Sequence, residues 1–144
     1  MFSILHDFTI HASRTEVFKA FTDPDQFNKW WTLKCEGIPG NGEEYRFYFS
    51  DEYDWKAVVD HFEKNQSVSY KMTTSSPEWA GTTFGIDLEE DGESTLVQFF
   101  HSGWSQQEAE YRRTSFCWAN LLYLLKRWVE DQETLDFEKR DRSS

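Results

Sequence analysis

The chain has 144 residues, with 15 Lys and Arg against 26 Asp and Glu, which gives a formal net charge of −11. This length is typical of a single domain with one hydrophobic core. The acidic balance excludes a nucleic-acid-binding protein, because too few cations are available to replace the counterions around phosphates, and it disfavours docking on an anionic membrane surface.

The first elements in the chain are predicted to be one strand and two short helices. Residues 2–11 alternate between apolar and polar side chains, which is typical of a half-buried strand. Ser13 precedes Glu16 by three positions, a capping-box spacing that predicts a helix over 14–21. Asp23 followed by Pro24 marks the start of a second short helix, which carries Phe27, Trp30 and Trp31.

A strand-rich middle and a long final helix follow. The turn residues between apolar stretches predict an antiparallel meander with strands at 43–50, 54–62, 67–74, 82–89 and 94–101. From 107 to 132 the apolar residues recur every three or four positions, which predicts a helix. Its predicted buried face consists of Phe116, Trp118, Leu121, Leu122, Leu125, Trp128 and Val129. The charged tail at 132–144 is expected to fray or to extend the helix outward.

The layout of these elements predicts an α+β fold. A helix about 10 Å wide cannot cover six to seven strands spaced about 4.8 Å apart, so the sheet must curl around it. We therefore expect a single domain over 1–144, with a curved antiparallel sheet wrapped around the C-terminal helix and two short helices after the first strand. Curling leaves a hollow between sheet and helix unless side chains fill it.

Several segments resemble the START-like, or SRPBCC, superfamily, and within it the branch of heat-shock-protein-90 ATPase activator-like domains. The segment 10–31 (IHASRTEVFKAFTDPDQFNKWW) resembles the opening signature of that branch, with its Val-Phe, Thr-Asp-Pro and Trp-Trp. HSGW at 101–104 resembles the end of the last strand, and 117–131 resembles the closing helix. Cys117 stands where this family usually has glycine, a departure that narrows the space beside Trp118. The middle of the chain, 40–90, matches only in pattern.

The resemblance implies the helix-grip fold and a cavity between the sheet and the long helix. It does not imply one activity, because this fold hosts lipid carriers, hormone receptors, polyketide cyclases and chaperone-binding domains.

Aromatic residues are the strongest candidates for a binding site. The chain has 13 Phe, 7 Trp and 6 Tyr, so its core either interdigitates tightly or leaves a hollow lined by rings. The residues expected to line the cavity are Trp31, Phe47, Phe49, Trp55, Tyr70, Phe84, Phe100, His101, Trp104, Trp118 and Leu122. Two interpretations stay open, a ligand pocket and a filled core.

His101 also has two interpretations. Either face of strand 94–101 could point inward, because both carry large apolar groups. An inward His101 could donate to a polar ligand atom or titrate near neutral pH. Alternatively, it is a structural histidine that bonds to backbone carbonyls at the end of the strand.

Other chemistry has little support in the sequence. The two cysteines and four histidines show no metal-ligand or redox spacing, so we expect no metal, no cofactor and two reduced thiols. There is no nucleophile elbow and no Gly-rich phosphate loop, so no catalytic residue is assigned. No signal peptide or transmembrane helix is recognised, and we expect a cytoplasmic protein.

Three functions follow from these expectations. The preferred hypothesis is non-catalytic binding of a small hydrophobic or aromatic ligand in the sheet–helix cavity. The first alternative is a protein-interaction module of the chaperone-activator type, in which the acidic surface docks to a basic patch on the partner. The second alternative is a cyclase- or hydrolase-like enzyme that uses His101 or Tyr70 as an acid–base group. A homodimer is also conceivable, through the sheet edges or through exposed aromatic residues.

Overall fold

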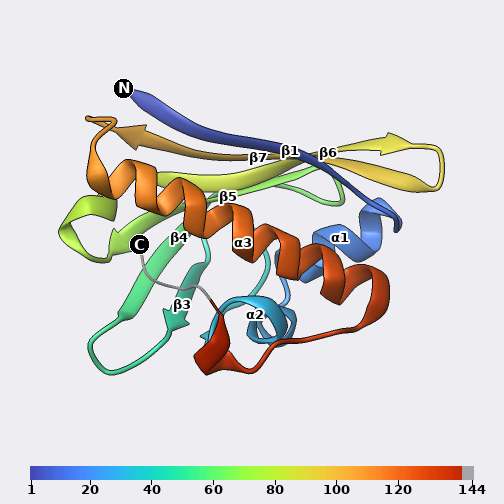
Figure 1. Cartoon of the computed structure of the whole chain (residues 1–144), viewed down its shortest axis with the longest axis horizontal. Helices are drawn as coiled ribbons and strands as arrows, with labels where there is room; N and C mark the ends of the chain where they lie inside the picture. Colours follow the sequence, from blue (N-terminus) through green and yellow to red (C-terminus); the bar gives the residue numbers. More distant parts are fainter. Residues whose placement is uncertain (141–144) are drawn as a thin grey trace.

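The computed structural model describes residues 1–140 and consists of one seven-stranded antiparallel sheet and three α-helices (Figure 1). The strand order is β1-β7-β6-β5-β4-β3-β2. The elements are β1 (Phe2–Ile10), α1 (Arg14–Ala20), α2 (Pro24–Trp30), β2 (Lys34–Glu36), β3 (Glu44–Tyr48), β4 (Asp54–Glu63), β5 (Ser67–Thr74), η1 (Pro77–Trp79), β6 (Thr83–Asp91), β7 (Ser94–Trp104), α3 (Ala109–Asp131) and η2 (Phe137–Lys139).

The curved sheet packs one face against α3, which runs obliquely across it, and α1 and α2 close one end (Figure 1). This confirms the predicted helix-grip architecture. The predicted strands fall within a few residues of those observed. Three short elements, β2, η1 and η2, have no counterpart in the prediction, because three residues are too few to show a period.

Both short helices begin as their sequences predict. The Ser13 hydroxyl accepts a hydrogen bond from the backbone N–H of Glu16 at 3.3 Å. At α2, the Asp23 carboxylate accepts from the N–H of Asp25 at 3.0 Å, and Pro24 occupies the first helical position. These bonds satisfy N–H groups that have no partner within the helix.

The inward face of α3 differs from the prediction at Phe116. The fully buried residues of this helix are Thr114, Cys117, Trp118, Leu121, Leu122, Leu125 and Val129. Phe116 is instead 68% exposed. It lies two positions before Trp118, and residues two apart on a helix face nearly opposite directions. The prediction that Phe116 belongs to the buried face was therefore wrong.

The chain after α3 also differs from the expected fraying or extension. Gln132 adopts a left-handed conformation and ends the helix, and residues 133–140 fold back onto α2. Arg140 is 8% exposed and donates to the carbonyls of Asn28 at 3.0 Å and Thr32 at 3.3 Å. Carbonyls at a helix C-terminus lack partners within the helix, and the guanidinium supplies donors. The rest of the predicted tail, 141–144, lies outside the described residues.

Across residues 1–140, no helix combines the length and the hydropathy needed to cross a bilayer.

Candidate functional site

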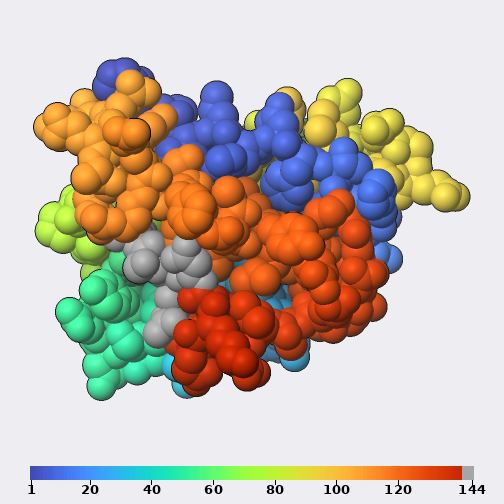
Figure 2. Space-filling model, in the orientation of Figure 1, coloured from blue at the N-terminus to red at the C-terminus, as the bar shows by residue number. Residues whose placement is uncertain are grey.

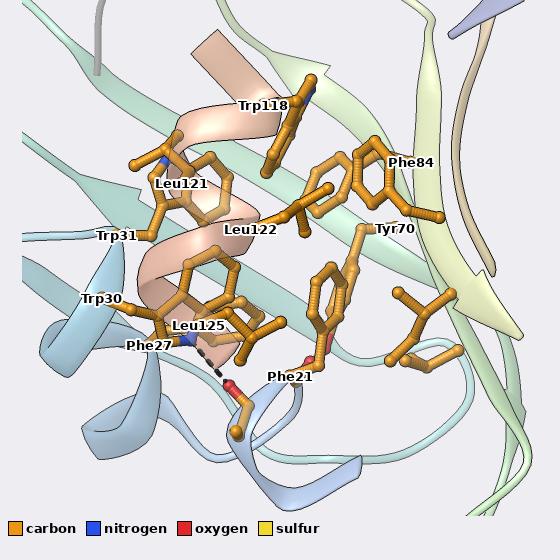
Figure 3. Packing of buried hydrophobic residues seen from close by; sticks show 14 of the residues in the cluster. Phe21, Phe27, Trp30, Trp31, Tyr70, Phe84, Trp118, Leu121, Leu122 and Leu125 are labelled. Atoms are coloured by element: carbon orange, nitrogen blue, oxygen red, sulfur yellow. Dashed lines mark hydrogen bonds between the residues drawn. The ribbon is translucent and has the colours of Figure 1, made fainter. Parts of the chain in front are cut away.

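Aromatic side chains from the sheet, from α3 and from the two short helices meet in the interior (Figure 3). Alternate residues of β3, β5 and β6 point toward α3, and α3 meets them with Trp118, Leu121, Leu122 and Leu125. The short helices and the turns after them add Phe21, Phe27, Trp30 and Trp31 from the end of the sheet.

The rings in this interior touch one another. The ring centroids of Trp31 and Phe47 lie 5.0 Å apart, those of Trp31 and Trp118 lie 5.1 Å apart, and those of Trp55 and Trp79 lie 4.7 Å apart. Most pairs are tilted or edge-on, the arrangements that aromatic quadrupoles favour. The space between sheet and helix is therefore filled largely by the aromatic residues themselves.

Among the described residues, this interior contains a small void of about 10 Å³, at the lower limit of the space that can hold one water molecule. It is lined by Trp31, Trp55, Trp79, Thr114, Cys117, Trp118 and Leu121. Two lining atoms, Trp79 Nε1 and Thr114 Oγ1, are buried and have no hydrogen-bond partner within residues 1–140. Buried polar groups nearly always have a hydrogen-bond partner, so two unbonded polar atoms beside the same void are unusual.

His101 is fully buried and points inward, and both of its ring nitrogens are hydrogen-bonded. Trp118 Nε1 donates to His101 Nδ1 at 3.0 Å, so the ring proton lies on Nε2, which donates to Thr82 Oγ1 at 2.8 Å. The Thr82 hydroxyl in turn donates to the carbonyl of Trp79 at 2.6 Å. Burial lowers the pKa of His101 to about 3, because the charged imidazolium would lose its hydration.

Two buried tyrosines tie the α1–α2 connection to the sheet. Tyr70 donates to the carbonyl of Phe21 at 2.7 Å, and Tyr45 donates to the carbonyl of Thr22 at 2.5 Å. Burial raises the pKa of both hydroxyls. His101 and Tyr70, the groups predicted for the enzyme alternative, are therefore both engaged in structural hydrogen bonds and held neutral near pH 7.

Of the eleven predicted cavity residues, ten lie in this interior and one does not. The ten are Trp31, Phe47, Phe49, Trp55, Tyr70, Phe84, His101, Trp104, Trp118 and Leu122. Phe100 is the exception and lies on the outer face of the sheet. Strand register explains this, because Phe84 pairs with His101 and faces inward, while Gly85 pairs with Phe100 and faces outward. Neighbours on a strand cannot share a face.

Four residues that line the void were not among the predicted site residues. Trp79 lies on η1, and Thr114, Cys117 and Leu121 lie on α3. Thr114 continues the period of the buried helix face, so its position could have been found from spacing alone. Trp79 follows a Ser-Ser-Pro turn signal, and no periodic pattern in the sequence points to its burial.

The outer face of the sheet has two adjoining open hollows of about 540 and 350 Å³. Both are lined by Phe100 and Asp87. The remaining side chains include Leu5, which is 69% exposed, and the carboxylates of Asp7 and Asp60. We call this surface the outer hollow. It combines apolar and acidic side chains, and it faces away from α3.

A curled antiparallel sheet that grips a long C-terminal helix places this protein in the START-like class. The family model described as Activator of Hsp90 ATPase homolog 1-like protein matches residues 11–130. The chain belongs to that family. Among curated proteins, none matches the sequence significantly.

Solved structures agree with this assignment. The Aha1 dimer of Colwellia psychrerythraea superposes with a TM-score of 0.84 at 28% identity, over 92% of this chain and 99% of that one. A Staphylococcus saprophyticus protein gives a TM-score of 0.80 at 19% identity, over 94% and 96%. CalU16 from Micromonospora echinospora gives 0.74 at 19% identity, over 96% and 83%. The last two, at such low identity, support the fold alone.

Proposed function

We propose that this protein is an interaction module of the chaperone-activator type, which binds a basic surface of an Hsp90-type chaperone through its outer hollow. The observation that carries the proposal is the packing of aromatic rings that fills the space between the sheet and α3 among the described residues. A guest larger than one water molecule would have to displace packed rings from a void of about 10 Å³. The outer hollow, in contrast, is already open.

The chemistry of the outer hollow suits a cationic partner segment with an apolar anchor. Leu5 and Phe100 provide apolar contact, and Asp7, Asp60 and Asp87 add negative charge to the same hollows. The net charge of −11 would speed encounters with a basic surface. The family to which the chain belongs supports a chaperone as that partner.

The test is the ATPase rate of an Hsp90-type chaperone from the same organism, measured with increasing amounts of this protein. We expect a saturable increase whose apparent affinity falls as salt rises. Leu5→Ser and Asp87→Lys should each weaken it about tenfold. Asp91→Lys is the matched control, because this acidic residue lies at the β6–β7 turn away from the hollow. An unchanged ATPase rate, or equal effects of both Asp variants, would refute the proposal.

Binding of a small flat aromatic molecule in the interior is a second candidate, favoured by the two unpartnered polar atoms at the void. An oxygen atom of a ligand could accept hydrogen bonds from Trp79 Nε1 and Thr114 Oγ1. Trp79 belongs to the short η1 turn rather than to a ladder strand, so it can move without breaking the sheet. Its displacement would open a space the size of an indole.

This second candidate is tested by adding 1-naphthol or naphthalene to the protein and following its tryptophan fluorescence. Saturable binding of 1-naphthol, weakened about tenfold by Thr114→Val and much weaker for naphthalene, would support it. Thr74→Val, at an exposed position of β5, is the control. Absence of saturable 1-naphthol binding would refute this second candidate function, and the outcome is independent of the chaperone assay.

A further inference from the structure

We infer that the outer face of α3 is a docking surface for a second copy of this chain, with the two helices packed antiparallel about a two-fold axis. This inference goes beyond the proposed function and uses a different surface. The surface, here called the α3 stripe, consists of Arg112, Phe116, Ala119, Tyr123 and Arg127.

The α3 stripe exposes two large aromatic side chains on one rigid element. Phe116 is 68% exposed and Tyr123 is 54% exposed. They lie seven residues apart, so they project from the same side of the helix two turns apart. Ala119 and Asn120 lie between them, and the short side chain of Ala119 allows another helix to approach closely. Figure 2 shows α3, in orange, crossing the front of the molecule with no other described segment over its outer side.

The spacing of the α3 stripe is self-complementary. Its midpoint lies between Ala119 and Asn120, and Phe116 and Tyr123 are equally far from that midpoint along the helix. In an antiparallel pair, Phe116 of each copy therefore meets Tyr123 of the other. A two-fold axis makes both contacts at once, which is how an isologous interface forms.

The charges at the ends of the α3 stripe are also complementary. Arg112 makes no ion pair with any described residue, whereas Arg127 contacts Glu133 and lies 3.9 Å from Asp131. Arg127, Glu133 and Asp131 together carry one net negative charge. In the antiparallel register, Arg112 of one copy lies opposite Arg127 of the other, and the Glu133 and Asp131 carboxylates that pair with Arg127 are the groups available to Arg112 at both ends of the interface. Such pairing offsets at short range the repulsion between two acidic proteins, which salt screens beyond about 8 Å.

Side chains of α3 and α2 partly cover the two edges of the sheet, which makes strand pairing a less direct route to a dimer. At the β1 edge, Tyr111 donates to the carbonyl of Ser3 at 2.8 Å and Lys126 donates to that of Thr9 at 2.5 Å. At the other edge, β2 has only three residues, and the N–H of Cys35 donates to the Asn28 side chain at 2.8 Å. The similar Colwellia psychrerythraea protein, solved as a dimer, supports a second copy as the occupant.

The test is sedimentation velocity of the full chain over a range of concentrations. We expect a monomer–dimer equilibrium whose dissociation constant rises at least tenfold with Phe116→Ser or Tyr123→Ser. Leu5→Ser is the matched control, because Leu5 is equally exposed but lies on the opposite side of the sheet. A wild-type chain that stays monomeric, or a dimer that Leu5→Ser weakens as much as Phe116→Ser does, would overturn the inference.

A cross-linking experiment tests the geometry itself. Ala119→Cys should be joined to its counterpart in the second copy by a short bis-maleimide, because the proposed axis passes beside this residue. Ser3→Cys, exposed at the far end of β1, should not be joined. The native Cys35 and Cys117 are buried, which limits background reaction. Cross-linking of Ser3→Cys in preference to Ala119→Cys would exclude the α3 interface whether or not the chaperone is activated.

Discussion

Trp118 donates its indole N–H to Nδ1 of His101, and this single bond decides which nitrogen of the imidazole carries the proton. The chain of bonds continues through Thr82 to the carbonyl of Trp79. It thereby connects α3, β7 and the turn that holds Trp79. A core rich in aromatic rings gains in this way a directional polar link, which apolar packing alone does not supply.

The buried, neutral state of His101 predicts that stability falls in mild acid. Above pH 6.5 the imidazole is neutral in both the folded and the unfolded chain. Below pH 6.5 the unfolded chain binds a proton, while the folded chain resists protonation down to the folded-state pKa of about 3. At pH 5 this costs about 2 kcal/mol of unfolding free energy. Urea unfolding at pH 7.5 and pH 5 measures the difference.

His101→Gln provides the comparison for that experiment. The variant should be less stable at pH 7.5, because Gln cannot reproduce both ring hydrogen bonds. Its stability should nevertheless change less than that of the wild type between pH 7.5 and pH 5. An equal loss in both proteins would show that other groups cause the acid sensitivity.

Gly85→Ala is expected to destabilise the sheet strongly. A Cβ at this position would collide with the carbonyl oxygen of Val68 and lie 2.8 Å from Cα of Ser69. Both obstacles are backbone atoms of the neighbouring strand, so the ladder itself must shift. We expect a loss of at least about 2 kcal/mol, measured by thermal or urea unfolding. Asp87→Ala, also on the outer face of β6, should change stability by less than about 0.5 kcal/mol.

Arg140→Met is expected to loosen the segment that folds back onto α2. The guanidinium donates to three backbone carbonyls, those of Asn28, Thr32 and Leu135. Methionine keeps much of the apolar stem but leaves those carbonyls without a charged donor, at a cost of about 1–3 kcal/mol. Hydrogen exchange should quicken in α2 and after Gln132. Lys139→Met, at the exposed neighbouring position, should leave exchange unchanged.

Tyr70→Phe tests the hydrogen bond that holds the end of α1 to the sheet. Removing the hydroxyl leaves the buried carbonyl of Phe21 without this donor, and we expect a loss of about 1–2 kcal/mol. Tyr48→Phe removes a hydroxyl whose bond to Asp51 is exposed, so its effect should stay below about 0.5 kcal/mol. Similar losses in the two variants would show that burial of the bond to Phe21 does not decide its contribution.

The fold could be predicted from the sequence wherever a period or a cap extends over several residues. The alternation in 2–11, the Ser13 and Asp23 caps and the long apolar helix all specify elements that the structure contains. Phe116 was misplaced because its hydrophobicity was counted without its angle around the helix. Three-residue elements such as β2 and η1 carry too little pattern to be recognised.

The candidate site was predictable in composition but not in volume. The strand pattern correctly gathers most of the aromatic residues on one face, but the ring-to-ring distances that decide between a pocket and a filled core depend on tertiary packing. The positions of Phe100 and His101 show the same dependence on tertiary packing. Both are large enough for a core, and only the pairing of Gly85 with Phe100 determines which one faces α3.

The contact between Arg140 and Asn28 also bears on how the protein is made. These two residues are separated by 112 positions, and within residues 1–140 β1 pairs with β7 alone. During synthesis the amino-terminal part emerges first and must wait for these distant partners. The aromatic face of the sheet therefore cannot be covered until α3 has emerged from the ribosome, and a holding chaperone would be most useful to this protein during that interval.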